Sequence, residues 1–235
     1  MGFLTVNFSI KEMFDSIASQ YDLANRILSL GQDVNWRMSS IKRADIRSDG
    51  LILDAATGTG DMAVFIAKNN SSANKILGID FSKEMIRQAV EKAKRERVSE
   101  KILFHCADIE NLPFKKESFR YVFIAFGLRN LSDVRRGLKE FYRILKKDGK
   151  LSILEFSAPK QGFISTLSWF YVRYIVPFVG TLTTGRYLAY KYLSQSILNF
   201  FTPEDLKKLI LDTGFRQVSV TQFGFGVVNL YLAIK

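Results

Sequence analysis

The segment Leu51-Ile-Leu-Asp-Ala-Ala-Thr-Gly-Thr-Gly-Asp61 predicts an apolar strand that runs into a glycine turn and then into a helix. Gly58 and Gly60 allow the backbone to turn tightly and to approach a ligand where a Cβ atom would clash. Asp80 ends the next predicted strand, about twenty residues further on, where an acid can hydrogen-bond ribose hydroxyls. Together these features predict a nucleotide or nucleoside site at the first turn of a parallel sheet.

The surrounding sequence alternates short apolar runs with amphipathic helical stretches, which indicates an α/β, doubly wound, mostly parallel sheet. Five runs predict parallel strands: 51–54, 75–80, 101–105, 120–125 and 150–155. Two more runs, 216–223 and 227–234, flank Gly224-Phe-Gly226 and predict a C-terminal antiparallel hairpin. These seven strands are the expected sheet. Ser82 and Thr202 are expected to cap the helices that follow them.

The 235 residues fit one domain with added helical segments. We expect an N-terminal helical lid at 1–47, an α/β core at 48–156 and 202–235, and an aromatic-rich helical insert at 157–201 that covers the substrate site. The N-terminus shows no signal peptide pattern, so a cytoplasmic chain is expected.

Charge and rare residues limit the possible partners. Thirty-four Lys and Arg against 23 Asp and Glu give a net charge of +11, which favours an anionic partner, either nucleic acid or a membrane surface. The single Cys106 and single His105 exclude an internal disulfide and a Cys- or His-rich metal site. Both lie on a predicted strand, and we expect them to be buried structural residues.

The glycine turn leaves two ligands to compare, because Gly58-Thr-Gly-Asp-Met-Ala63 also fits the G-x-G-x-x-A pattern of dinucleotide sites. Asp61 would place a negative charge at the helix N-terminus where a pyrophosphate binds. Asp54, at the end of the first strand, could instead reach a cationic amino group. S-adenosylmethionine fits better, because it is a nucleoside with an ammonium group and no phosphate.

Asp54-x-x-x-Gly58-x-Gly60, Asp80, and Ala107-Asp108 followed by Leu112-Pro-Phe114 resemble the successive motifs of class I S-adenosylmethionine-dependent methyltransferases. The resemblance implies that Asp108 meets the adenine amino group and that Gly58, Thr59 and Gly60 meet the methionyl part. Ala56 stands where the family usually has glycine. The full cofactor set implied in this way is Asp54, Ala56, Thr57, Gly58, Thr59, Gly60, Asp80, Phe81, Asp108, Ile109 and Ala125.

Further segments narrow this resemblance to the ubiquinone/menaquinone biosynthesis C-methyltransferases. They are Phe14–Asp22 with Asn25, Leu28–Gly31, Trp36-Arg37, Ala55–Asp61, Phe126-Gly-Leu-Arg-Asn130, Leu154–Pro159 and Tyr190–Ile197. The resemblance implies methylation of a ring carbon of a polyprenylated quinol precursor, with menaquinone slightly favoured over ubiquinone. The side chains expected to contact this substrate are Tyr21, Trp36, Phe126, Tyr171 and Tyr190.

Methylation of a ring carbon requires a ring hydroxyl to be deprotonated or strongly polarised. Arg129 and Asn130 follow the fourth strand, at the edge where open α/β sheets bind ligands. We expect Arg129 to stabilise the phenolate and Asn130 to orient the hydroxyl, against the alternative of a solvated loop charge. Asp61 could hold that network or the methionyl ammonium. Asp33 stands where relatives often have a histidine, and it is a candidate replacement base; Ala125 stands where they often have serine.

The insert holds many aromatic residues, and no acid lies between Glu155 and Glu204. It could be a simple lid, or a lid that also encloses a prenyl tail and touches anionic lipid through Arg173, Arg186 and Lys191. Nucleic acid is disfavoured, because the basic run Lys92–Arg97 is diluted by acids and predicts a solvated helix face. Two other functions stay open: methylation of another phenol or lipid, and a non-catalytic methyltransferase-like subunit. A homodimer is possible.

Overall fold

The computed structural model describes residues 10–47, 50–70, 75–158 and 170–235. Part of the predicted insert, 159–169, lies outside these ranges. The helical elements are α1 (Ile10–Ile17), η1 (Ala18–Gln20), α2 (Tyr21–Leu28), α3 (Gln32–Ala44), α4 (Asp61–Asn69), α5 (Lys83–Arg95), η2 (Ile109–Asn111), η3 (Leu128–Asn130), α6 (Val134–Ile144), η4 (a π-helical turn, Tyr171–Ile175), α8 (Val176–Thr184), α9 (Tyr187–Leu198), α10 (Pro203–Asp212) and η5 (Gly224–Gly226).

Within these described ranges, seven strands form one sheet in the order β3-β2-β1-β4-β5-β7-β6. The strands are β1 (Leu51–Ala55), β2 (Ile76–Asp80), β3 (Ile102–Cys106), β4 (Phe119–Ala125), β5 (Leu145–Phe156), β6 (Gln217–Phe223) and β7 (Val228–Ile234). The first five pair in parallel, while β7 pairs antiparallel to both β5 and β6. The predicted α/β fold with its C-terminal hairpin is therefore confirmed.

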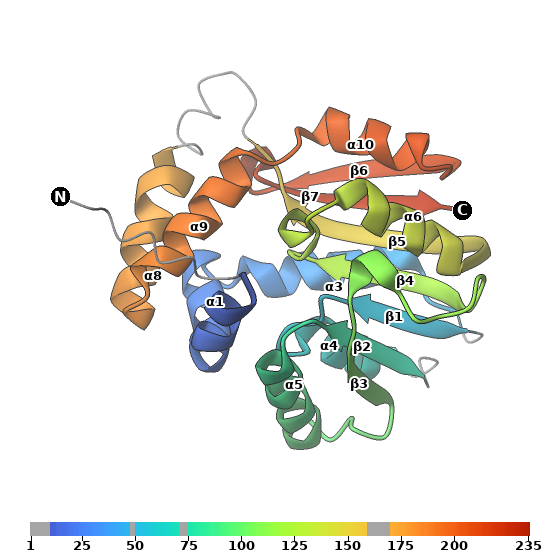
Figure 1. Ribbon diagram of the computed structural model, residues 1–235, viewed down its shortest axis with the longest axis horizontal. Helices are drawn as coiled ribbons and strands as arrows, with labels where there is room; N and C mark the ends of the chain where they lie inside the picture. Colours follow the sequence, from blue (N-terminus) through green and yellow to red (C-terminus); the bar gives the residue numbers. More distant parts are fainter. Residues whose placement is uncertain (1–9, 48–49, 71–74, 159–169) are drawn as a thin grey trace.

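The sheet is covered on both faces because successive strand residues point to opposite sides. Leu53 of β1 and Val122 of β4 join the core beneath α6 and α10, whereas their neighbours Ile52 and Phe123 join the core beneath α3, α4 and α5. Figure 1 shows these two helical layers around the twisted sheet. Every central strand is thus buried on both faces, as its continuous apolar run predicts.

The predicted caps explain where two helices begin. The Ser82 hydroxyl accepts a hydrogen bond from the Met85 amide at 3.0 Å, which starts α5. The Thr202 hydroxyl accepts from the Asp205 amide at 3.2 Å, and Pro203 occupies the first position of α10.

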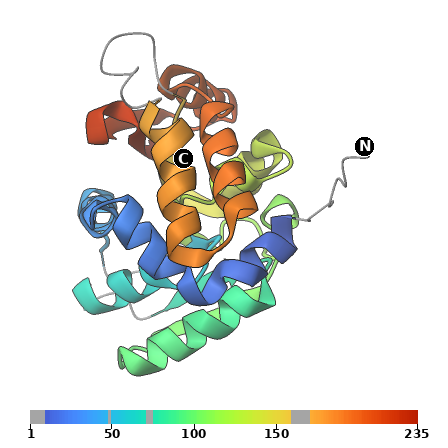
Figure 2. The same ribbon diagram turned by 90° about the vertical axis from the view of Figure 1, so that its left-hand side faces the viewer.

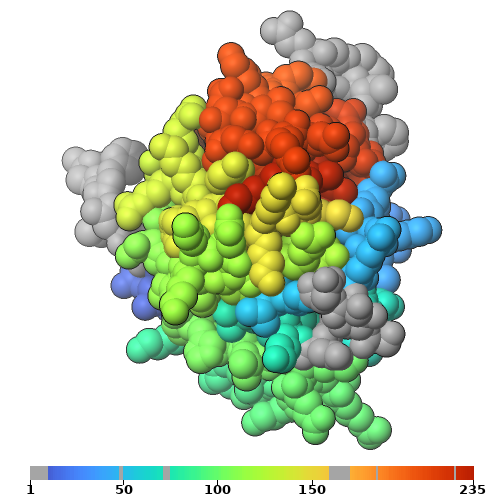
Figure 3. Space-filling view, turned by 90° about the vertical axis from the view of Figure 1, so that its right-hand side faces the viewer, coloured from blue at the N-terminus to red at the C-terminus, as the bar shows by residue number. Residues whose placement is uncertain are grey.

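The N-terminal helices and the insert meet at one end of the sheet. Figure 2 shows α1 and α2 in blue against α8 and α9 in orange at that end. Phe14, Ile17, Tyr190 and Met85 of α5 share one apolar cluster there. Figure 3 shows the opposite end of the molecule, where α10, in orange-red, lies above the green and yellow segments of the α/β core.

The expectation that His105 and Cys106 are buried is wrong. Both side chains are exposed, as is Leu103 on the same strand. The reason is topological: β3 is an edge strand of the sheet, so it has a neighbour on one side only.

Candidate functional site

A cavity opens at the carboxyl ends of the parallel strands, beside the switch point between β1 and β4. It brings together residues that are far apart in the sequence. The predicted residues that line it are Tyr21, Ala56, Gly58, Asp80, Phe81, Asp108, Ile109, Ala125, Phe126 and Asn130.

The glycine turn is built around Asp80. The Gly58 amide donates a 2.9 Å hydrogen bond to Oδ2 of Asp80, and the Ser82 amide donates one of 3.0 Å to Oδ1. Gly58 has a φ of +55°, which a residue with a side chain rarely adopts. Asp80 is almost fully buried, and this burial raises its pKa despite the backbone donors. Both oxygens are thus fixed at the cavity, ready to accept from hydroxyl groups.

Asp54 lies beneath the turn rather than in the cavity. Its Oδ2 accepts from the Thr57 hydroxyl at 2.5 Å and from the Ala63 amide at 3.0 Å. Burial raises the pKa of Asp54 to about 7. Asp54 and Thr57 therefore support the glycine turn from below.

Ala56 adopts a left-handed conformation with a φ of +51°. A Cβ atom added to Gly127 would lie only 2.4 Å from the Ala56 Cβ. The side chain that replaces the usual glycine at position 56 is therefore accommodated because residue 127 has none.

The rim of the cavity carries acidic side chains, among them Asp108, and several aromatic rings. Asp108 Oδ1 accepts from the Glu110 amide at 2.8 Å, which holds the carboxylate at this edge. Phe81 packs edge-to-face on Phe14, with ring centroids 6.1 Å apart. Tyr21 and Phe126 complete the apolar wall. Phe14 was not expected to line the cavity, because its spacing fits a core position equally well.

Arg129 is buried and paired rather than solvated. Its Nη1 donates to Glu155 Oε1 at 2.9 Å and to the Phe126 carbonyl at 2.5 Å. The alternative of a solvated loop charge is therefore wrong. The sequence does not identify Glu155 as the partner of Arg129, because a strand residue within an apolar run gives no signal for a charged pair.

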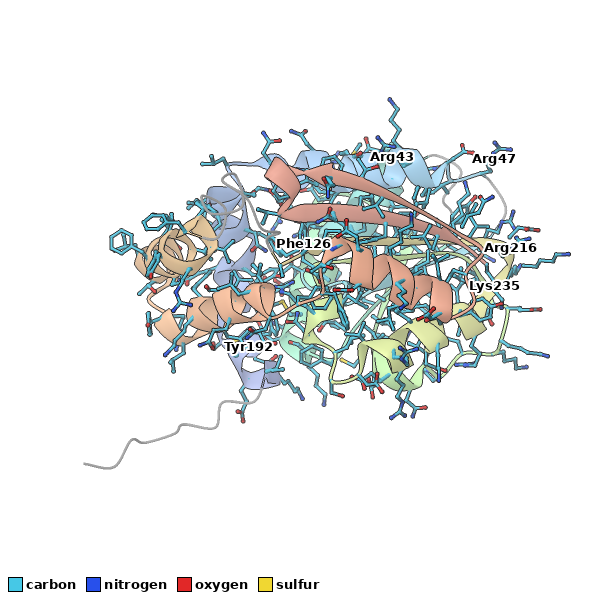
Figure 4. The ribbon with its side chains drawn as sticks, turned by 90° about the horizontal axis from the view of Figure 1, so that it is seen from above. Arg43, Arg47, Phe126, Tyr192, Arg216 and Lys235 are labelled. Atoms are coloured by element: carbon cyan, nitrogen blue, oxygen red, sulfur yellow. The ribbon has the colours of Figure 1, made fainter. Side chains whose placement is uncertain are left out.

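Asn130 faces the cavity beside this ion pair. Its Oδ1 accepts from the Tyr192 hydroxyl at 3.1 Å, whereas its Nδ2 reaches only the Phe126 carbonyl at 3.5 Å, the limit of a hydrogen bond. Figure 4 shows Phe126 near the middle of the molecule and Tyr192 nearer the end that carries α8 and α9, whereas the labelled basic residues Arg43, Arg47, Arg216 and Lys235 lie on the other side of Phe126.

Asp33 and Asp61, the two acids expected to take part in catalysis, both form ion pairs with basic side chains. Asp33 pairs with Arg26 and, at 3.0 Å, with Arg37. Asp61 pairs with Arg26 at 2.9 Å and with Lys92 at 2.5 Å. The expectation that Lys92 lies on a solvated helix face is wrong, because its side chain is only 9% exposed.

Three of the expected substrate side chains do not line the cavity. Trp36 packs near Phe126, with ring centroids 6.3 Å apart. Tyr190 is buried against Gly180, and Tyr171 donates from its hydroxyl to the Leu28 carbonyl at 2.5 Å. Trp36 packs the N-terminal helices against the core, and Tyr171 and Tyr190 pack the insert against the N-terminal helices. In the described ranges, no group of His, Cys, Asp and Glu could hold a metal ion.

Known proteins resemble this chain in sequence and in fold. Relatives include a ubiquinone/menaquinone biosynthesis C-methyltransferase UbiE of Geotalea uraniireducens, 41% identical over 96% of both chains, and a demethylmenaquinone methyltransferase of Deinococcus radiodurans, 38% identical over 97% of this chain and 92% of that one. A SAM-dependent methyltransferase structure from Aquifex aeolicus has a TM-score of 0.67 at 18% identity and covers 94% of this chain and 98% of that one.

A Haemonchus contortus phosphoethanolamine N-methyltransferase 2 in complex with S-adenosyl-L-methionine has a TM-score of 0.72 at 17% identity, covering 99% of this chain and 61% of that one. At such low identity these two structures share the fold alone. The ubiE/COQ5 methyltransferase family matches residues 5–235. The chain belongs to the ubiE/COQ5 methyltransferase family.

Proposed function

We propose that the chain transfers a methyl group from S-adenosylmethionine to a ring carbon of a polyprenylated quinol precursor, such as demethylmenaquinol. Family and fold identify the cofactor, and the names of the relatives suggest the acceptor. One observation supports both halves of the proposal: the cavity joins the cradle of Gly58 and Asp80 to an aromatic wall that ends at Asn130.

The cradle fits S-adenosylmethionine. Asp80 offers two fixed carboxylate oxygens to ribose hydroxyls, and Asp108 offers an acceptor at the rim for an exocyclic amino group. Phe81 offers an aromatic surface beside them. The bound cofactor supplies an electrophilic methyl group, so the residues of this chain have to align the acceptor and enrich its ring with electrons.

The field of Arg129 would favour the ionised acceptor. Burial raises the pKa of Tyr21 and of Tyr192, and the positive charge of Arg129 opposes part of this rise at both hydroxyls. A quinol hydroxyl placed beside Asn130 would experience the same field, and Nδ2 of Asn130 can donate to its oxygen. Asp33 and Asp61, each held by two cations, are better suited to positioning these elements than to accepting a proton.

The proposal is tested by transfer of labelled methyl from S-adenosylmethionine to reduced quinols, counted in the organic phase. Label in prenylated demethylmenaquinol or in its ubiquinone-pathway counterpart is expected. A tail-free quinol should react with a higher KM if the insert encloses the tail. Cofactor binding without label in any quinol would refute the proposed acceptor.

The insert also supports a peripheral membrane contact, which is part of this proposal. Phe178 and Leu182 are 64% and 72% exposed, one helical turn apart on α8. Arg173, Arg186 and Lys191 lie on the same acid-free insert, which suits an anionic lipid surface. No helix in the described part of the chain is long and apolar enough to cross a membrane.

Co-sedimentation with phosphatidylglycerol vesicles tests this contact. We expect Phe178→Ser with Leu182→Ser to lose binding, while Leu103→Ser, an exposed leucine on β3, should bind like the wild type. Equal binding by all three proteins would exclude the proposed surface.

A further inference from the structure

Lys92 is a buried cation with its three donors fully used. It follows Met85 and Ala89 along the buried face of α5, so the helix carries it inward. Burying an ammonium group is costly unless it is paired and hydrogen-bonded. Its Nζ lies 2.6 Å from Asp22 Oδ2, 2.5 Å from Asp61 Oδ1 and 3.0 Å from Thr59 Oγ1.

These three partners come from two parts of the molecule. Thr59 and Asp61 belong to the glycine turn and to the start of α4, whereas Asp22 lies on α2 of the N-terminal lid. The Thr59 hydroxyl also donates to Asp22 Oδ1 at 2.5 Å. Lys92 therefore lies at the junction where the lid is joined to the turn.

The junction continues as a chain of alternating charges. From Lys92 it passes through Asp61 to Arg26, and then through Asp33 to Arg37. Burial alone would raise the pKa of Asp61, but the charges of Lys92, Arg37 and Arg26 hold it below its ordinary value. Helix α2 thus contacts the network at two points, Asp22 and Arg26, one turn apart.

The residue before Asp22 is Tyr21, which forms part of the cavity wall. Its Cε1 atom lies 4.0 Å from the position that a Cβ on Gly58 would occupy. A shift of α2 would therefore move Tyr21 relative to the turn that holds the cofactor.

We propose that Lys92 is a positioning residue that couples the N-terminal lid to the glycine turn, so that cofactor affinity depends on the ion pair between Lys92 and Asp22. The inference rests on the proposed function only for the identity of the cofactor. It requires no particular acceptor.

Two variants separate the halves of the junction. Lys92→Met removes the cation, and Asp22→Asn removes the carboxylate on α2 while leaving every residue of the glycine turn in place and an amide oxygen that can still accept from Thr59. Because Asp22 is 38% exposed, Asp22→Asn is the variant expected to fold normally. Lys94→Met, on the exposed face of the same helix, is the matched control.

Isothermal titration calorimetry with S-adenosylmethionine, in the absence of acceptor, measures the Kd that decides between these possibilities. Lys92→Met and Asp22→Asn should each raise the Kd for S-adenosylmethionine about tenfold. The double variant should have a Kd close to the higher of these two values, because both substitutions remove the same interaction. Lys94→Met should match the wild type. Thermal unfolding, recorded in parallel, reports the purely structural contribution.

Unchanged Kd in Asp22→Asn or in a folded Lys92→Met, even with a lower Tm, would overturn the inference. Additive losses in the double variant would also overturn it. If the Kd values of the variants change as expected but the wild type methylates no quinol, the proposed acceptor is wrong while the role of Lys92 stands.

Discussion

Arg129 Nη1 lies 2.9 Å from Glu155 Oε1, and the two side chains are 4% and 0% exposed. The pair joins η3, which follows β4, to the neighbouring strand β5; neither residue lines the cavity, but Asn130, next to Arg129, does. Glu155 also accepts from the Arg129 amide at 3.2 Å, so the carboxylate fixes both the backbone and the side chain of Arg129. Arg129 is therefore held in place before any acceptor binds.

Removing the carboxylate should strongly destabilise the protein. Glu155→Gln leaves a buried guanidinium without its counter-ion, which typically costs about 3–5 kcal/mol of unfolding free energy. Urea denaturation measures this loss. Glu84→Gln, which breaks the exposed pair with Arg87, is the control and should change little. Equal effects of the two substitutions would show that the buried pair has no special importance.

Asn130 should contribute to turnover more than to folding. Asn130→Ala removes a donor for the acceptor's oxygen, and we expect kcat to fall about 100-fold, as for other donors to developing oxyanions. Tyr192→Phe removes only the hydroxyl that holds Asn130 Oδ1, so its loss should be smaller. Steady-state kinetics with a prenylated quinol checks both. Full kcat in Asn130→Ala would exclude this role.

Ala56 and Gly127 should behave as a coupled pair. Gly127→Ala forces two methyl groups together and should destabilise the protein by about 1–3 kcal/mol. Ala56→Gly removes one of them and also relieves a left-handed φ, so the double variant should regain most of the loss. Thermal unfolding of the single and double variants gives the coupling. Strictly additive effects would contradict the contact.

Asp54 should make stability depend on pH. In the unfolded chain its pKa is about 3.9, whereas burial raises it to about 7 in the folded protein. Between these values the folded chain keeps a proton that the unfolded chain has released. The contribution of Asp54 is therefore fully present below about pH 4 and is lost as the pH rises through 7.

Asp54→Asn keeps an acceptor for Thr57 and Ala63 but does not titrate. The Tm of the wild type minus that of this variant should therefore decrease between pH 5 and pH 8. A constant difference across this range would show that Asp54 has an ordinary pKa.

The parts of the site that depend on the order of neighbouring strands and turns along the chain could be predicted from the sequence. A strand followed by Gly58, and an acid at the end of the next strand, must meet in a parallel sheet. The exposure of Cys106 was not predictable in this way, because one chain does not reveal that its third strand is at the edge. The roles of Lys92 and Glu155 were not predicted for a related reason, because their partners, Asp22 and Arg129, are distant in the sequence. The sequence around a charged residue does not show whether its side chain is paired or solvated.

The contacts of the aromatic insert were not predictable for the same reason, because they also join residues that are distant in the sequence. The aromatic spacing of 157–201 predicted helices but not which rings would face the cavity. Tyr190 packs on Gly180 instead, and Tyr171 contacts the end of α2.

The most direct test of the account is the position of the transferred methyl group. The wild-type protein is incubated with methyl-deuterated S-adenosylmethionine and prenylated demethylmenaquinol, and the product is examined by NMR and mass spectrometry. The account predicts a deuterated methyl group bonded to a ring carbon, with both ring hydroxyls unmethylated. A methyl group on oxygen, or none on the quinol, would contradict it.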